Sequence, residues 1–154
     1  MSDFRETIDV DCTPDEVWTY VIEPSHLPEW QASAVSAERL DEGPIGVGSR
    51  VRVTRHVGSR EIPMTMEITE CDPPHAWGMQ GIDGPVRGHV HGEIDPLDDG
   101  RRSRVTLELD FEGHGLGKVL VPLVVKPQTR KELPRNEQML KERLEQQGGG
   151  IGAP

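Results

Sequence analysis

The feature that most constrains the fold of this chain is a helical apolar pattern in its last quarter, residues 115–147. The positions i, i+3, i+4, i+7 and i+8 of one helix face are occupied by Leu116, Val119, Leu120, Leu123 and Val124. The same stripe continues with Leu133, Leu140 and Leu144. A long amphipathic helix needs an apolar surface to cover, so the preceding residues must supply one.

Three prolines interrupt this pattern, at positions 122, 127 and 134. Each lacks a backbone N–H donor and crowds the carbonyl four residues earlier, so a straight helix through all three is disfavoured. We therefore expect a helical arm with a kink or a break, restarting at Pro134 as a first-turn proline. Within the arm, Glu137 and Lys141 have the favourable i, i+4 order for an ion pair.

The chain begins with a predicted strand followed by two short helices. Residues 4–11 alternate between apolar and polar side chains, which predicts a strand. Thr13 and Glu16 form a capping box that starts a helix, and Pro24 ends it. Residues 25–31 then predict a second short helix or turn.

From residue 35 onward the period of the apolar pattern changes to two, which is typical of strands. Turns of hairpin length separate these strands, so the sheet is predicted to be antiparallel. Only the terminal helix is long enough to cover the apolar face of that sheet, and the fold class is therefore α+β. The six predicted strands span residues 35–40, 50–57, 61–69, 77–79, 86–94 and 104–111.

The length of 154 residues is that of one domain. The hydrophobic fraction is 34% with six aromatic residues, which indicates either a hollow domain or simply a lean, soluble one. We expect a single domain over residues 1–147 and a flexible tail over 148–154.

The formal net charge of −10 argues against nucleic acid or an anionic membrane as a general partner. The N-terminus has no apolar signal-peptide core, and no stretch reaches the length of a transmembrane helix, so membrane insertion is not expected. The two cysteines, Cys12 and Cys71, lack the spacing of a zinc or redox motif. The sequence thus predicts a reduced, cytoplasmic protein.

Several short segments carry a resemblance to a known superfamily. The sequence TPDEVW at 13–18 is followed by PSHLPEW at 24–30 and by ITECDPP at 68–74. The triplet RVT at 104–106 and LKERLE at 140–145 complete the set. In this order the segments resemble the START-like (SRPBCC) superfamily of the polyketide cyclase/dehydrase type, over residues 3–146.

The resemblance implies a helix-grip fold. In such a fold a curved seven-stranded antiparallel sheet wraps around a long C-terminal helix, with two short helices after the first strand and an apolar cavity between sheet and helix. Families of this kind bind lipids, polyketides, hormones and other apolar small molecules, and some members catalyse aromatic ring closure or dehydration.

If the terminal helix covers the apolar faces, strand alternation predicts which side chains point inward. Trp30 is expected at the mouth of the cavity, and three residues of the terminal helix, Leu116, Leu120 and Leu123, are expected to line it. The same residues would also serve as an ordinary packed core. The inward-facing strand residues are Val51, Val53, Met64, Met66, Trp77, Met79, Val90, Leu107 and Leu109.

Few polar residues share this inward face. Arg55 is in phase with Val51 and Val53, so its guanidinium would either reach the cavity or bend outward to a carboxylate at the end of the sheet. The remaining candidates for proton transfer are His26 and Glu29. No catalytic residue can be assigned from the sequence.

A His-x-His pair, His89 and His91, is followed in phase by Glu93, a spacing that can supply metal ligands. Because they alternate with Val90 and Ile94, these side chains are predicted to face solvent on the convex side of the sheet. No metal site and no cofactor is expected.

Three functional hypotheses follow. The leading one is binding of an apolar small molecule, lipid or polyketide-like, between sheet and terminal helix, with Arg55 or backbone groups orienting a polar end. The alternative is a polyketide cyclase or dehydratase that holds a reactive chain in the same cavity. The third is an interaction module that forms a homodimer through its convex face.

Overall fold

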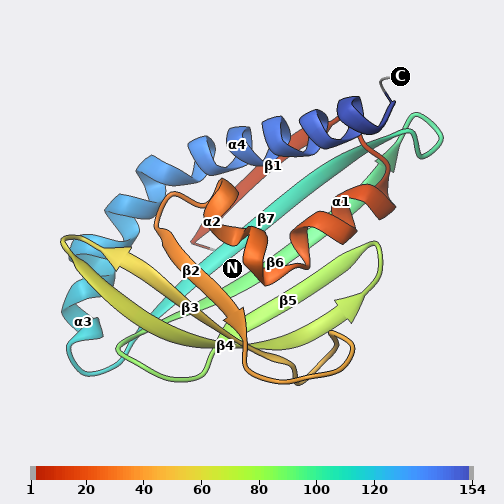
Figure 1. Ribbon diagram of the computed structural model, residues 1–154. Coiled ribbons are helices and arrows are strands. Elements are labelled where there is room, and N and C mark those ends of the chain that lie inside the picture. The colour runs from red at the N-terminus through yellow and green to blue at the C-terminus, as the bar shows by residue number, and fades with distance from the viewer. Residues whose placement is uncertain (1–2, 153–154) are drawn as a thin grey trace.

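A computed structural model describes residues 3–152 of the chain, with side chains described for residues 3–146. Seven strands form one antiparallel sheet in the order β1-β7-β6-β5-β4-β3-β2, and helices cover one face of it (Figure 1). The predicted α+β helix-grip fold is confirmed. The strands are β1 (Phe4–Val10), β2 (Ala34–Arg39), β3 (Arg50–Val57), β4 (Arg60–Asp72), β5 (Ala76–Gly81), β6 (Val86–Leu97) and β7 (Arg102–Gly113).

The sheet is curved, and two irregularities in its register contribute to the bend. One register shift lies between Ala34 and Ser36, where β2 pairs with β3, and another lies between Ile68 and Glu70, where β4 pairs with β5. Bulges of this kind bend a strand and increase its twist. The concave face that results surrounds the helices (Figure 1).

Three short helices follow β1: α1 (Pro14–Val21), a 3₁₀ turn η1 (Pro24–His26) and α2 (Leu27–Trp30). The predicted capping box is present, since the Glu16 backbone N–H donates to the Thr13 hydroxyl and the Thr13 N–H donates to the Glu16 carboxylate. Val17, Tyr20 and Val21 form the buried face of α1.

The terminal arm is one continuous helical path with a change of helix type. It consists of α3 (Gly117–Leu120), a π-helical segment η2 (Val121–Val125) and α4 (Lys126–Gly152). The predicted interruption lies at η2, where a wide turn accommodates the missing donor of Pro122. The predicted restart at Pro134 is wrong, because Pro134 lies exposed inside α4. The tail expected at 148–154 extends beyond the described side chains, and its flexibility stays a prediction.

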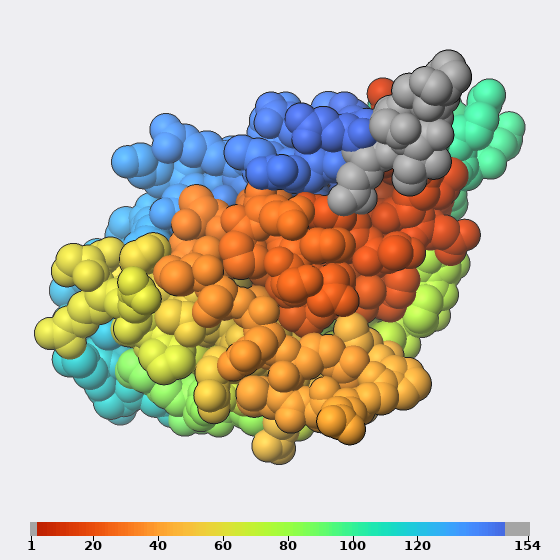
Figure 2. All heavy atoms as spheres, viewed as in Figure 1, coloured from red at the N-terminus to blue at the C-terminus, as the bar shows by residue number. Residues whose placement is uncertain are grey.

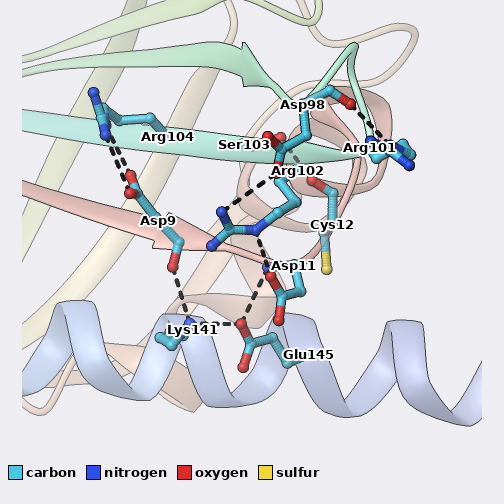
Figure 3. A network of polar contacts seen from close by, with 10 residues as sticks. All are labelled: Asp9, Asp11, Cys12, Asp98, Arg101, Arg102, Ser103, Arg104, Lys141 and Glu145. Carbon is cyan, nitrogen blue, oxygen red and sulfur yellow. Dashed lines mark hydrogen bonds and ion pairs between the residues drawn. The ribbon is translucent and has the colours of Figure 1, made fainter.

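The C-terminal half of α4 is held to β1 and the residue after it by polar contacts, which we call the β1–α4 clamp (Figure 3). The clamp consists of Asp9, Asp11, Lys141 and Glu145. The Lys141 ammonium donates to the Asp9 carbonyl oxygen at 3.0 Å and to the Glu145 carboxylate at 2.6 Å. The Asp11 N–H donates to the same carboxylate at 3.1 Å. The predicted pair Glu137–Lys141 is therefore wrong, since Lys141 pairs with Glu145, one turn further on.

Beneath the clamp lies the main apolar core, in which Leu140 is fully buried and Leu144 nearly so, against α1 and the sheet. The two cysteines are free. Cys12 is buried in this core, and its thiol donates to the Leu144 carbonyl oxygen at 3.2 Å. A second apolar cluster holds η2 against the other end of the sheet, and consists of Val57, Met64, Val86, Val121 and Val125.

Candidate functional site: a cavity between sheet and terminal helix

A cavity of about 150 Å³ lies between the concave face of the sheet and α4. Strands β3 to β7 form its floor, residues 21–33 form one side, and α4 forms the other. In the space-filling view, residues of the short helices and of α4 close over the sheet (Figure 2). An engineered cavity of similar volume binds benzene, so this one accommodates at least one six-membered ring.

Most of the side chains predicted to point inward line this cavity. Strand alternation was sufficient to find them, because the sheet has one covered face. Val51 lines the cavity as well. The residues named from the sequence that lie in its wall are Trp30, Val53, Arg55, Met64, Met66, Trp77, Met79, Val90, Leu107 and Leu109.

The inward orientation predicted for the start of the terminal arm is wrong. Leu116 and Leu123 are exposed at 59% and 70%, and Leu120 packs at the margin of the second apolar cluster, outside the cavity wall. The buried residues of this segment are instead Gly117, Val121 and Val125, a stripe at i, i+4 and i+8.

The reason for this orientation is a close backbone approach. The carbonyl oxygen of Pro85 accepts the His114 N–H at 2.9 Å, and an ideal Cβ at position 117 would overlap the Pro85 carbonyl group. Glycine is thus required where α3 meets the β5–β6 connection. This contact turns the side of α3 that carries Gly117 toward the sheet, and Leu116 consequently faces solvent.

Arg55 supplies the cationic group of the cavity wall. Its guanidinium donates to the Ser33 hydroxyl at 3.0 Å, and among the described residues it forms no ion pair. Removal from water lowers the pKa of Arg55 to about 10, and the charge of Glu132 acts in the opposite direction. Arg55 therefore remains a cation at neutral pH, and the alternative orientation toward a carboxylate at the sheet end is not adopted.

Trp30 adds a second polar group. The residue is 4% exposed, and its indole Nε1 has no hydrogen-bond partner among the described residues. A buried N–H without an acceptor is costly, and a molecule that brings an acceptor to it recovers that cost. Trp30 is thus a wall residue with an unused donor.

The polar side of the cavity that α4 contributes was missed from the sequence. Gln128 bridges to the β3–β4 hairpin, accepting from the Gly58 N–H at 3.1 Å and donating to the His56 carbonyl oxygen at 2.9 Å. Asn136 accepts the Ala32 N–H at 3.0 Å. The available signal was a helical stripe of mixed polarity, formed by Val125, Gln128, Thr129, Glu132, Leu133 and Asn136.

His26 and Glu29 do not line the cavity. Both are engaged with Tyr20, whose hydroxyl donates to the Glu29 carboxylate at 2.6 Å and whose ring stacks on His26 at 4.3 Å. Burial, and next this hydrogen bond, raise the pKa of Tyr20. Of the three candidates for proton transfer, only Arg55 reaches the cavity.

His91 lies on the opposite face of the sheet from the cavity wall. Its ring contacts the carboxylates of Glu70 and Glu93, each at 3.0 Å, and the Glu93 hydrogen bond is the main cause of its raised pKa. The nearby His89 lies 3.9 Å from Glu112. Among the described residues, no group of three or more His, Cys, Asp or Glu side chains is arranged to hold a metal ion.

Glu137 is a buried carboxyl outside the cavity. It is 3% exposed where α4 packs on β1, and neither carboxylate oxygen has a hydrogen-bond partner among the described residues. Burial, and secondly repulsion by Glu6, raise the pKa of Glu137 to about 8. The side chain is therefore protonated at neutral pH.

Comparison with known families identifies the class of protein that this fold and cavity represent. Residues 1–145 match the family described as polyketide cyclase/dehydrase and lipid transport. The chain belongs to this family. No curated protein sequence matches the chain. None of the described helices is both long and apolar enough to cross a bilayer.

Solved structures give the same fold. The Zhui aromatase/cyclase from Streptomyces sp. R1128 superposes with a TM-score of 0.79 at 15% identity, covering 98% of each chain. A START superfamily protein from Mycobacterium smegmatis gives 0.71 at 15% identity, covering 93% of this chain and 97% of that one. The di-domain ARO/CYC BexL gives 0.68 at 18% identity, covering 92% of this chain and 46% of that one.

Proposed function

We propose that the protein binds an apolar, ring-containing small molecule in the cavity, with an acceptor group of that molecule against Arg55 and Trp30. The observation that carries the proposal is a half-buried guanidinium that lines the cavity and has no ion-pair partner among the described residues. Cations that are removed from water are normally paired, so this position favours a ligand oxygen that completes the site. Carboxylate, phenolate and enolate groups meet this requirement.

The energetics are those of a small, mostly apolar site. Burial of about 100 Å² of ligand carbon surface contributes roughly 2.5 kcal/mol, at about 25 cal/mol per Å². A hydrogen bond to a charged group adds about 1.5–3 kcal/mol. Together they give about 4–5.5 kcal/mol, which corresponds to a Kd of about 0.1–1 mM for a molecule that buries this area. The three cavity methionines, Met64, Met66 and Met79, can adapt to rings of different shape.

The first experiment is native mass spectrometry of gently purified protein, followed by denaturing extraction. A discrete added mass that extracts as an aromatic or polyketide-like compound supports the proposal and identifies the ligand. A bare mass, together with no thermal stabilisation by any member of a panel of apolar aromatic compounds, would overturn it.

The Arg55→Met variant tests the polar end of the site. We expect binding of 2-naphthoate to weaken about 10- to 100-fold, because one charge-assisted hydrogen bond is lost. Binding of 2-methylnaphthalene, which has no acceptor, is expected to change little. Quenching of tryptophan fluorescence measures both affinities, since Trp30 and Trp77 line the cavity.

The matched control is Arg52→Met, on the same strand but exposed and outside the cavity wall. It should leave both affinities unchanged. Equal loss of both probes in Arg55→Met would mean that the guanidinium acts only through packing, and would remove Arg55 from the proposed site.

Cyclisation or dehydration of a polyketide chain is the second candidate function, favoured by the family assignment and by the presence of Glu132 and Arg55 in one cavity wall. In this case the cavity would act chiefly by holding the chain in a reactive conformation. Incubation with a poly-β-ketone thioester tests it. Product formation that is lost in Arg55→Met and retained in Arg52→Met supports catalysis, whereas unchanged product ratios with and without protein exclude it.

A further inference from the structure

The α3–η2 segment presents an apolar surface to solvent. Leu116, Val119 and Leu123 are exposed at 59%, 54% and 70%. Their spacing of i, i+3 and i+7 places them on one side of the helical arm. Figure 1 shows α3 at the opposite end of the molecule from the C-terminal end of α4. We call these three residues the apolar tip.

The charge around the apolar tip differs from that of the rest of the chain. Residues 114–131 contain four basic side chains, Lys118, Lys126, Arg130 and Lys131, and no acidic one. All 27 acidic residues lie elsewhere in a chain whose net charge is −10. Lys118, Arg130 and Lys131 are exposed, whereas Lys126 is half-buried and lies 3.4 Å from the Asp3 carboxylate.

The apolar tip and the basic residues belong to the same helical arm and follow one another in sequence. The three residues of the apolar tip are exposed before and within η2, and the exposed basic residues Arg130 and Lys131 follow in α4, with Arg130 also 5.8 Å from the centroid of the Phe4 ring. Apolar side chains flanked by exposed lysine and arginine are typical of segments that lie at a membrane surface.

We propose that residues 114–131 dock the protein reversibly on an anionic lipid surface. The apolar tip enters the boundary between headgroups and acyl chains, and Lys118, Arg130 and Lys131 lie near the lipid phosphates. The acidic residues lie outside residues 114–131, although Glu112 and Glu132 flank this range in sequence and Asp3 lies 3.4 Å from Lys126. The overall charge therefore does not exclude an anionic membrane, because the docking surface carries the opposite sign.

A second copy of this chain fits the same surface less well. A two-fold contact through the tip would bring the basic residues of both copies close together, and nothing in 114–131 offers them a carboxylate. The apolar tip also consists of only three side chains, whereas a stable dimer needs a much larger contact.

The position of the apolar tip next to the cavity is a further argument that its partner is a lipid surface. The buried side of the same short segment contributes Val125 to the cavity wall. Val121 belongs to the same apolar cluster as Val57 and Met64, which also line the cavity. When the protein is docked, only the α3–η2 segment would separate its cavity from the lipid phase. The docking itself does not depend on what the cavity holds.

Vesicle flotation tests the proposal, with vesicles of phosphatidylcholine alone and of phosphatidylcholine mixed with phosphatidylglycerol. We expect binding to the anionic vesicles only, weakened by added salt. The double variant Leu116→Ser/Leu123→Ser should reduce the partition coefficient at least about tenfold, since two of the three inserting side chains are lost. Lys118→Gln/Lys131→Gln should reduce binding and flatten its salt dependence.

Val47→Ser is the matched control, because Val47 is exposed at 70%, as Leu123 is, but lies outside the segment. It should bind vesicles like the native chain, and circular dichroism should show every variant folded. The proposal is overturned if the native chain ignores anionic vesicles, or if the Leu116/Leu123 variant binds them as well as Val47→Ser does. Concentration-dependent dimerisation that Leu123→Ser abolishes in the absence of vesicles would assign the tip to self-association instead.

Discussion

At pH 7 the Glu137→Gln variant is expected to be about 3 kcal/mol more stable than the native chain, since each unit of pKa difference corresponds to about 1.36 kcal/mol. The pKa of Glu137 is about 8 in the folded protein, against an ordinary value of 4.5. Between these values the folded state keeps the proton and the unfolded state releases it. The folded state thus binds more protons, so the stability of the native chain falls as the pH rises through this window.

The difference in free energy of unfolding between Glu137→Gln and the native chain should therefore be small at pH 4, grow steadily up to pH 8 and then level off. Urea unfolding at a series of pH values measures it. Glu142→Gln, an exposed change on the same helix, controls for the loss of one carboxyl and should follow the native curve. Parallel curves for the native chain and Glu137→Gln would show that the carboxyl is ionised in the folded protein.

Gly117→Ala is expected to destabilise the protein by about 3 kcal/mol, at the upper end of the range for overpacking. The added methyl group would overlap the Pro85 carbonyl group, which belongs to the backbone and already accepts the His114 N–H. The arm must then move outward, and Val121 and Val125 lose contact with the sheet. For a domain of this size the loss corresponds to a decrease in Tm of about 10 °C.

Gly46→Ala is the control for this variant. No atom lies within 4 Å of an added Cβ at position 46, and its backbone is outside the left-handed region. Differential scanning calorimetry should show Gly46→Ala at or slightly above the native Tm. A Gly117→Ala protein with native Tm would mean that α3 does not contact the β5–β6 connection as described.

The sheet and most of the cavity wall could be predicted from the sequence, because the alternation of apolar and polar side chains indicates which face of each strand is covered. The capping box at Thr13 was predictable for a similar reason, since both of its hydrogen bonds are local. The start of the terminal arm was not. Its orientation depends on Gly117 meeting Pro85, residues 32 positions apart in the chain, and on a π-helical turn that a period of 3.6 does not describe.

The polar residues of α4 were missed for a different reason. Selection of apolar positions alone left Gln128, Glu132 and Asn136 out of the predicted cavity wall, although they share a helical face with Val125 and Leu133. Glu137 was predicted only as an ion-pair partner of Lys141. Its burial depends on how α4 rotates over β1, and that rotation follows from long-range packing of Leu140 and Leu144.

The β1–α4 clamp also bears on how a molecule could leave the cavity. Directional hydrogen bonds hold α4 to β1 around Lys141, whereas Val121 and Val125 are held by apolar contacts that have no directional requirement. We therefore expect local opening to be confined to residues 117–125, because α4 is also hydrogen-bonded to the β3–β4 hairpin through Gln128. Ligand residence time would then reflect local opening at residues 117–125, and would be much shorter than the lifetime of the folded state as a whole.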